Sequence, residues 1–169
     1  MSEVEVEDVL RLHRLKTASY TVAGPLRMGF LLSPRASESD GTAESLRDYG
    51  REIGTAFQVK DDLLGLFGKK EETGKPITSD IEEGKRTLPL TTAYRRGTED
   101  QREKMKSIVG SNPSEEEFEA IKEIVEETGA KRKCEEMAEE MVEEGKGAVE
   151  SVESGFLTDL ADFIVERSY

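Results

Sequence analysis

Several residue types that often carry chemistry or cross-links are nearly absent from this sequence. It has no tryptophan, one histidine and one cysteine among 169 residues. A lone thiol, Cys134, cannot form an intrachain disulfide, so nothing indicates an oxidising compartment, and we expect Cys134 to be a small buried apolar residue. For the single histidine, His13, a structural or surface position is favoured over a catalytic one.

Long apolar runs are absent as well. The most apolar stretch, YTVAGPLRMGFLLSP, covers residues 20–34 and contains Pro25 and Arg27. It is too short and too interrupted to cross a bilayer, which takes about 20 apolar residues. The acidic N-terminal stretch, MSEVEVEDVL, lacks the basic region of a signal peptide. We therefore expect a cytoplasmic protein with no integral membrane segment.

Basic residues are in the minority, with 24 Lys and Arg against 37 Asp and Glu and a net charge of −13. Such a surface repels phosphates, so we expect no nucleic-acid partner. The charge does not exclude a small anionic substrate, because bound metal ions or a few lysines can reverse the field at one site.

Strand-like alternation is missing too, and apolar residues recur at helical spacing almost throughout, which predicts an all-α fold. The length suits one domain, residues 1–169. Glycine, proline, serine and charged residues predict loops near residues 33–41 and 68–87. In the first helical segment, three- and four-residue steps place one set of residues on a common predicted inward face: Val9, Leu12 (or His13), Lys16, Tyr20 and Ala23.

Helix ends and a second helix can also be placed. Capping boxes are predicted at Thr98 and Ser114, and Gly110 and Gly129 stand where helix C-caps belong. The second helix begins at Thr42. Its predicted inward positions are Leu46, Tyr49, Ile53, Phe57, Asp61 and Leu64.

The stretch FQVKDDLLGLFG puts Asp61 and Asp62 among apolar residues, with Asp61 on the predicted inward face. Most acidic pairs in this chain are simply solvated helix faces, and that alternative applies here too. Buried carboxylates need a positive partner, and hard oxygen ligands suit magnesium. Gln58 lies three residues before Asp61 and four before Asp62, which places its amide on the same side of the helix.

The predicted loop GKKEETGKPITSDIEEGKRT supplies positive charge. Lys75 and Lys85 bracket Asp80 there, and lysines near a magnesium site can bind a diphosphate. A surface loop with scattered charge is the alternative. Lys16 shares a helix face with Tyr20 and could equally lay its alkyl chain over apolar surface.

Four segments, KTASYT, GTAFQVKDD, GKPITSDI and EGKRT, occur in the order and at the intervals that resemble the trans-polyprenyl diphosphate synthases, which include the geranylgeranyl and farnesyl diphosphate synthases. The resemblance covers the whole sequence and corresponds to the C-terminal half of the family. It implies a helical bundle of the isoprenoid synthase type, truncated to its C-terminal helices. It also implies isoprenoid biosynthesis: an allylic diphosphate, held by Mg²⁺, is condensed with isopentenyl diphosphate.

The resemblance also implies roles for acidic residues. Asp61 and Asp62 match the start of the family's second aspartate-rich motif, in which the first aspartate binds magnesium. Asp80 matches an acid that supports the metal site through the residues around the metal. Gly65 stands where the motif usually ends in a third aspartate, as in archaeal members of the family.

Five further positions match the family's substrate-binding residues. Lys16, Lys75 and Lys85 match lysines that contact the allylic diphosphate. Thr17 and Gln58 match residues whose oxygens lie near the developing allylic cation.

The family's first aspartate-rich motif has no match, since no second pair of adjacent aspartates occurs. The isolated chain is therefore expected to be inactive as a prenyltransferase. We expect a homo-oligomer, or a hetero-oligomer completed by an N-terminal half or a full-length synthase. A non-catalytic regulatory subunit and an inactive truncated product are the alternatives.

Overall fold

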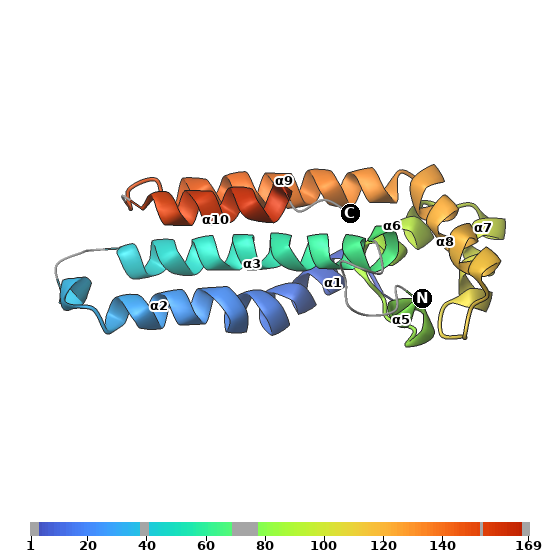
Figure 1. The fold of residues 1–169 in the computed structure, drawn as a ribbon, viewed down its shortest axis with the longest axis horizontal. Coiled ribbons are helices and arrows are strands. Elements are labelled where there is room, and N and C mark those ends of the chain that lie inside the picture. Colours follow the sequence, from blue (N-terminus) through green and yellow to red (C-terminus); the bar gives the residue numbers. More distant parts are fainter. Residues whose placement is uncertain (1–3, 38–40, 69–77, 153, 167–169) are drawn as a thin grey trace. The chain divides into compact units, whose positions relative to one another are not determined.

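The computed structural model describes residues 4–37, 41–68, 78–152 and 154–166, and every regular element in these ranges is a helix (Figure 1). The all-α prediction is confirmed. The elements are α1 (Val6–His13), the π-helix η1 (Arg14–Ala23), α2 (Gly24–Leu31), the 3-10 turn η2 (Pro34–Ser37), α3 (Thr42–Phe67), α5 (Ser79–Glu82), α6 (Leu88–Arg96), α7 (Glu99–Ile108), α8 (Glu115–Glu127), α9 (Ala130–Ala148) and α10 (Gly155–Glu166).

These helices form two compact units. The first unit comprises the described residues of 4–9 and 61–135, and the second those of 10–60 and 136–166. Across the described ranges, no helix is long and apolar enough to cross a membrane.

The π-helix η1 lies in the second unit, and its helical turn is wider than that of an α-helix. The Gly24 N–H donates to the Ser19 carbonyl, five residues earlier, and the Ser19 hydroxyl donates to the Arg14 carbonyl at 2.7 Å. This i→i+5 bonding differs from the i→i+4 bonding of an α-helix. Pro25, which has no N–H, follows in the first turn of α2.

The wider turn changes which residues of this segment are buried. His13, Ala18 and Ala23 are buried at five-residue intervals, whereas Lys16 and Tyr20 are exposed. The prediction that Lys16 and Tyr20 face inward was therefore wrong. Three- and four-residue steps hold for an α-helix, and a π-helix needs a longer step to return to the same face.

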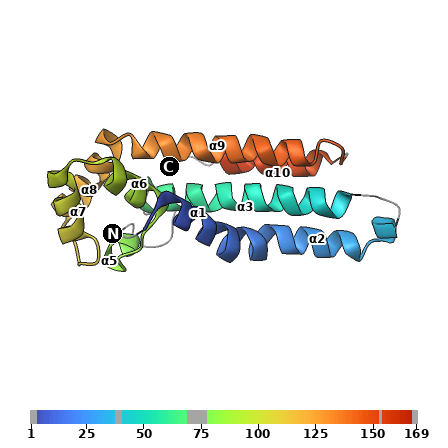
Figure 2. The same ribbon diagram turned by 180° about the vertical axis from the view of Figure 1, so that it is seen from behind.

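Two glycines of α3 let η1 approach closely (Figure 2). A Cβ built on Gly50 would lie 2.4 Å from the Ala23 Cα, and one built on Gly54 would lie 2.5 Å from the Ala18 Cα. No carbon fits at those distances. The pairing of small residues on both helices therefore sets the spacing between η1 and α3.

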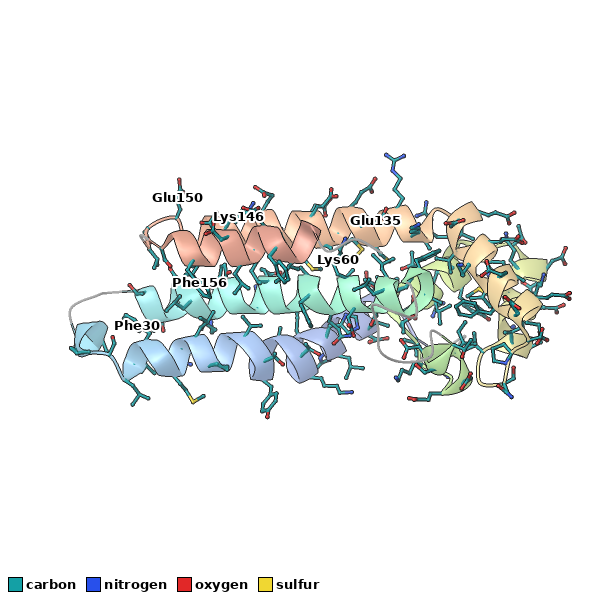
Figure 3. The ribbon with its side chains drawn as sticks, in the orientation of Figure 1. Phe30, Lys60, Glu135, Lys146, Glu150 and Phe156 are labelled. Atoms are coloured by element: carbon teal, nitrogen blue, oxygen red, sulfur yellow. The ribbon has the colours of Figure 1, made fainter. Side chains whose placement is uncertain are left out.

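Helices α9 and α10 complete the second unit. Gly145 of α9 receives the Ile53 side chain, since a Cβ there would lie 2.8 Å from Ile53 Cδ1. The Tyr49 hydroxyl donates to the Leu157 carbonyl at 2.6 Å, and burial raises the pKa of Tyr49 to about 12. In Figure 3 the Lys146 side chain lies on α9, from which it pairs with Asp162 of α10 at 2.5 Å.

The first unit has its own apolar core, built where α6, α7 and α8 pack together (Figure 1). Its buried members are Leu66, Ile81, Leu90, Ala93, Tyr94, Met105, Ile108, Phe118, Ile121, Ile124, Val125 and Ala130.

Local signals fix the helix ends of this unit as predicted. Both capping boxes form, with Thr98 and Gln101 at the start of α7 and Ser114 and Glu117 at the start of α8. Gly110 and Gly129 follow α7 and α8 with φ of 94° and 67°, in the left-handed region that favours glycine.

The lone cysteine lies inside this unit, as expected. Cys134 is fully buried, with its Sγ 4.0 Å from Thr92 Oγ1, and burial raises the pKa of the thiol to about 12. Since the thiolate is the reactive form, Cys134 acts as a packing residue.

We expect Gly50→Ala to destabilise the protein by about 1–3 kcal/mol, because the new methyl group must push η1 away from α3. The free energy of unfolding in urea measures this. Gly29→Ala on α2 is the matched control: a Cβ there meets nothing within 4 Å, so this change should be neutral or stabilising by about 0.5–1 kcal/mol. Equal effects at both positions would contradict the close approach.

Candidate functional site

The acid of the adjacent pair that lies in the interior is Asp62. Its side chain is 5% exposed, and its Oδ2 accepts a hydrogen bond of 2.8 Å from the buried N–H of Leu88. Leu88 is the first residue of α6, and the Thr87 side chain before it makes no capping bond. Asp62 therefore caps α6 from α3, where a negative charge also suits the helix N-terminus.

Asp61 is exposed, contrary to the prediction that it faces inward. Between residues 52 and 68, α3 is buried around most of its circumference, and Gln58, Asp61 and Gly65 lie along its less buried strip. The predicted face advanced from Ile53 by four residues at a time. Each such step turns the helix about 40° beyond a full turn, so two steps carry position 61 off that face.

Gly65 follows Asp61 by one helical turn and leaves room for another acid. A Cβ built on Gly65 would lie 2.8 Å from the Asp80 Oδ2. Residues four apart on a helix share one face. The Asp80 carboxylate therefore lies against the face of α3 that carries Asp61.

A helix-ending motif positions Lys85 over Asp80. Gly84 has φ of +64°, its N–H donates to the Ile81 carbonyl at 3.0 Å, and the Lys85 N–H donates to the Asp80 carbonyl at 2.9 Å. These two bonds form a Schellman motif at the end of α5. The Lys85 Nζ then lies 2.7 Å from the Asp80 Oδ1 and 3.0 Å from the Glu83 Oε2. Hydrogen bonds to Asp80 and then Glu83 raise the pKa of Lys85.

The second unit brings together two other predicted residues. The Thr17 hydroxyl of η1 donates to the Gln58 Oε1 of α3 at 2.8 Å. Lys16, next to Thr17, is exposed. Lys75 lies outside the described residues, as do all of residues 69–77 of the predicted loop 68–87; the described part of that loop contains the short helix α5.

Three of these arrangements were not predicted from the sequence: the cap that Asp62 forms on α6, the seat of Asp80 at Gly65, and the Thr17–Gln58 bond. A different arrangement, the placement of Lys85 over Asp80, could have been read from the Glu-Gly-Lys of residues 83–85, since a glycine after a helix turns the next residue back onto the last turn.

The chemistry of the acids on α3 and α5 suits magnesium. Mg²⁺ is usually bound through one or two carboxylates plus substrate phosphates. Asp61 and Asp80 supply two carboxylates to one face of α3. No group of three or more His, Cys, Asp or Glu side chains suited to a metal occurs in the described ranges. The residues present therefore fit a magnesium ion that a phosphate also binds.

Comparison with known proteins identifies the family. The family model for polyprenyl synthetase matches residues 1–128, about three quarters of the chain. The chain therefore belongs to the polyprenyl synthetase family, which confirms the resemblance found in the sequence.

Named relatives agree with this assignment. The chain is 37% identical over 172 residues to geranylfarnesyl diphosphate synthase of Natronomonas pharaonis, covering 99% of this chain and 48% of that protein. It is 35% identical over 171 residues to short chain isoprenyl diphosphate synthase of Methanothermobacter thermautotrophicus, covering 99% of this chain and 51% of that protein.

The fold also matches solved structures. Geranylgeranyl pyrophosphate synthase of Corynebacterium glutamicum, solved in complex with isoprenyl diphosphate and magnesium, superposes with a TM-score of 0.90 at 35% identity. The match covers 99% of this chain and 48% of that one. The chain thus spans about half the length of the relatives it matches.

We expect Asp62→Ala to destabilise the protein by about 1–3 kcal/mol, because it leaves the buried Leu88 N–H without its acceptor. Asp61→Ala, an exposed change one residue away, should alter the free energy of unfolding by about 0.5 kcal/mol or less. Urea unfolding of both variants measures the difference. A larger loss at Asp61 would show that the two aspartates have the opposite roles.

Proposed function

We propose that this chain is the allylic-diphosphate-binding part of a trans-prenyltransferase of isoprenoid biosynthesis, which uses Mg²⁺ and extends an allylic diphosphate with isopentenyl diphosphate. The observation that carries the proposal is the Asp80–Lys85 pair at 2.7 Å beside the α3 face that bears Asp61, in a chain of the polyprenyl synthetase family. The proposal treats residues 1–169 as one functional domain.

In this proposal the first unit binds the diphosphate. Lys85 contacts a diphosphate oxygen as a point charge, and Asp80 holds its ammonium group in place. Asp61 and Asp80 hold Mg²⁺, which, when bound, neutralises charge on the departing diphosphate. Asp62 keeps α3 and α6 in register rather than binding the metal directly.

The remaining residues take the roles that the family resemblance gives them. Lys75 contributes further charge to the diphosphate. Thr17 and Gln58 direct oxygens toward the developing allylic cation. Because the Thr17 hydroxyl donates to the Gln58 carbonyl oxygen, the orientation of the Gln58 amide is fixed before substrate binds.

The diphosphate site is tested by calorimetric titration of the chain with inorganic diphosphate in the presence and absence of Mg²⁺. Lys85→Ala should weaken Mg²⁺-dependent binding by about tenfold to a hundredfold, since a charge-assisted bond contributes about 1.5–3 kcal/mol. Lys146→Ala is the matched control: Lys146 also pairs with two acids, Glu143 at 3.0 Å and Asp162 at 2.5 Å, and its loss should leave binding unchanged. Equal losses in both variants, or no binding by the unmodified chain, would overturn the proposed site.

Catalysis is tested separately by chain elongation. The purified chain is supplied with an allylic diphosphate and isopentenyl diphosphate, alone and together with an N-terminal half of a family member. Product only in the mixture would support a prenyltransferase completed by a second polypeptide. No product in either case would overturn the catalytic role.

A non-catalytic partner subunit is the second candidate function, and exposed apolar residues favour it. Large side chains of the second unit stand out from η1 and α2, including Leu15 at 65% and Tyr20 at 82% exposure. Apolar surface of this kind is typical of interfaces.

We expect Leu15→Lys combined with Tyr20→Lys to lower self-association or binding to a full-length synthase of the family, as measured by light scattering after size-exclusion chromatography. Phe163→Lys on α10 is the control, because Phe163 is similarly exposed at 60% but lies on another helix. A monomer that binds no synthase would contradict this second function.

A further inference from the structure

Gly65 differs from the other close-packed glycines of the described helices. Gly24, Gly50 and Gly54 face the backbone of η1, and Gly145 faces an isoleucine side chain. At Gly65, the space that a side chain would fill holds a carboxylate instead: a Cβ there would lie 2.8 Å from Asp80 Oδ2 and 3.7 Å from Asp80 Cγ. Glycine is a poor residue for a helix interior, so its use here calls for a reason.

The two oxygens of Asp80 have different surroundings. Oδ2 lies in the space at Gly65, whereas Oδ1 accepts a 2.7 Å hydrogen bond from Lys85 Nζ. The Asp80 side chain is 22% exposed, so the carboxylate sits against the helix and is not free in solvent. A side chain on residue 65 would displace Oδ2 and, through the rigid carboxylate, move Oδ1 away from Lys85.

We propose that Gly65 is a positioning residue: its empty space seats the Asp80 carboxylate on α3, and the seated carboxylate in turn orients Lys85 toward the diphosphate. At the position one helical turn after Asp61, the carboxylate therefore comes from Asp80 of α5 and not from a residue of α3. The role of Lys85 in this inference rests on the proposed function, whereas the seating of Asp80 rests on geometry alone.

A double-mutant cycle measured by Tm, called the thermal cycle below, tests without any ligand whether Gly65 seats Asp80. Gly65→Ala should lower the Tm of the unmodified chain, because the methyl group collides with Oδ2. In an Asp80→Ala background the collision partner is gone, and Gly65→Ala should raise the Tm, as alanine favours the helix. Gly147→Ala on α9, where a Cβ meets nothing within 4 Å, is the matched control and should act alike in both backgrounds.

The sign of the effect decides this cycle. A Tm change at residue 65 that has the same sign with and without Asp80 would overturn the seat. Circular dichroism of each variant shows that helix content is retained.

A binding cycle tests the effect on Lys85. Gly65→Ala should weaken binding of inorganic diphosphate with Mg²⁺ by about threefold to tenfold. In a Lys85→Ala background the same change should have a smaller effect, since the part of the loss that acts through Lys85 is already gone. Additive losses would overturn the positioning role. If the unmodified chain binds no diphosphate, the proposed function and the role of Lys85 fail together, whereas the thermal cycle still decides whether Gly65 seats Asp80.

Discussion

A carboxylate buried in an apolar helix must find a hydrogen-bond donor, and Asp62 finds one at the first residue of α6. That single bond ties two helices of the first unit together and fixes where α6 begins. Because neighbouring residues on a helix point about 100° apart, the inward placement of Asp62 turns Asp61 outward. The adjacent acids thus differ in setting: Asp62 supports the fold, whereas Asp61 is exposed.

Charge balance gives a reason for the metal ion in the proposed diphosphate site. Lys85 lies within ion-pair distance of both Asp80 and Glu83, so its positive charge is already compensated. The chain as a whole carries a net charge of −13. In the proposed function, an incoming diphosphate would therefore be repelled by this surface unless a divalent ion, bound to carboxylates such as Asp61 and Asp80, reversed the local field. In the proposed function, Mg²⁺ supplies that reversal, and Lys85 orients the diphosphate by contacting one of its oxygens.

Much of the fold could be predicted because it depends on local signals. The capping boxes at Thr98 and Ser114 and the glycines after α7 and α8 involve residues at most a few positions apart, and all formed as predicted. The inward face of the first helix was predicted wrongly, since the π-helix lengthens the repeat and exposes Lys16. The orientation of the Asp61–Asp62 pair was also wrong, because a helix buried on most sides gives no clear apolar stripe from which to read direction.

The sequence by itself determined the helical class, the family and the identity of the acidic and basic residues, since periodicity and motif spacing are properties of the chain alone. Tertiary structure decided how those residues are used. The cap from Asp62 to Leu88, the Thr17–Gln58 bond, and the seat of Asp80 at Gly65 each join positions at least 15 residues apart. Such contacts depend on which helices pack together and how closely their backbones approach. The spacing of residues along the chain does not predict either.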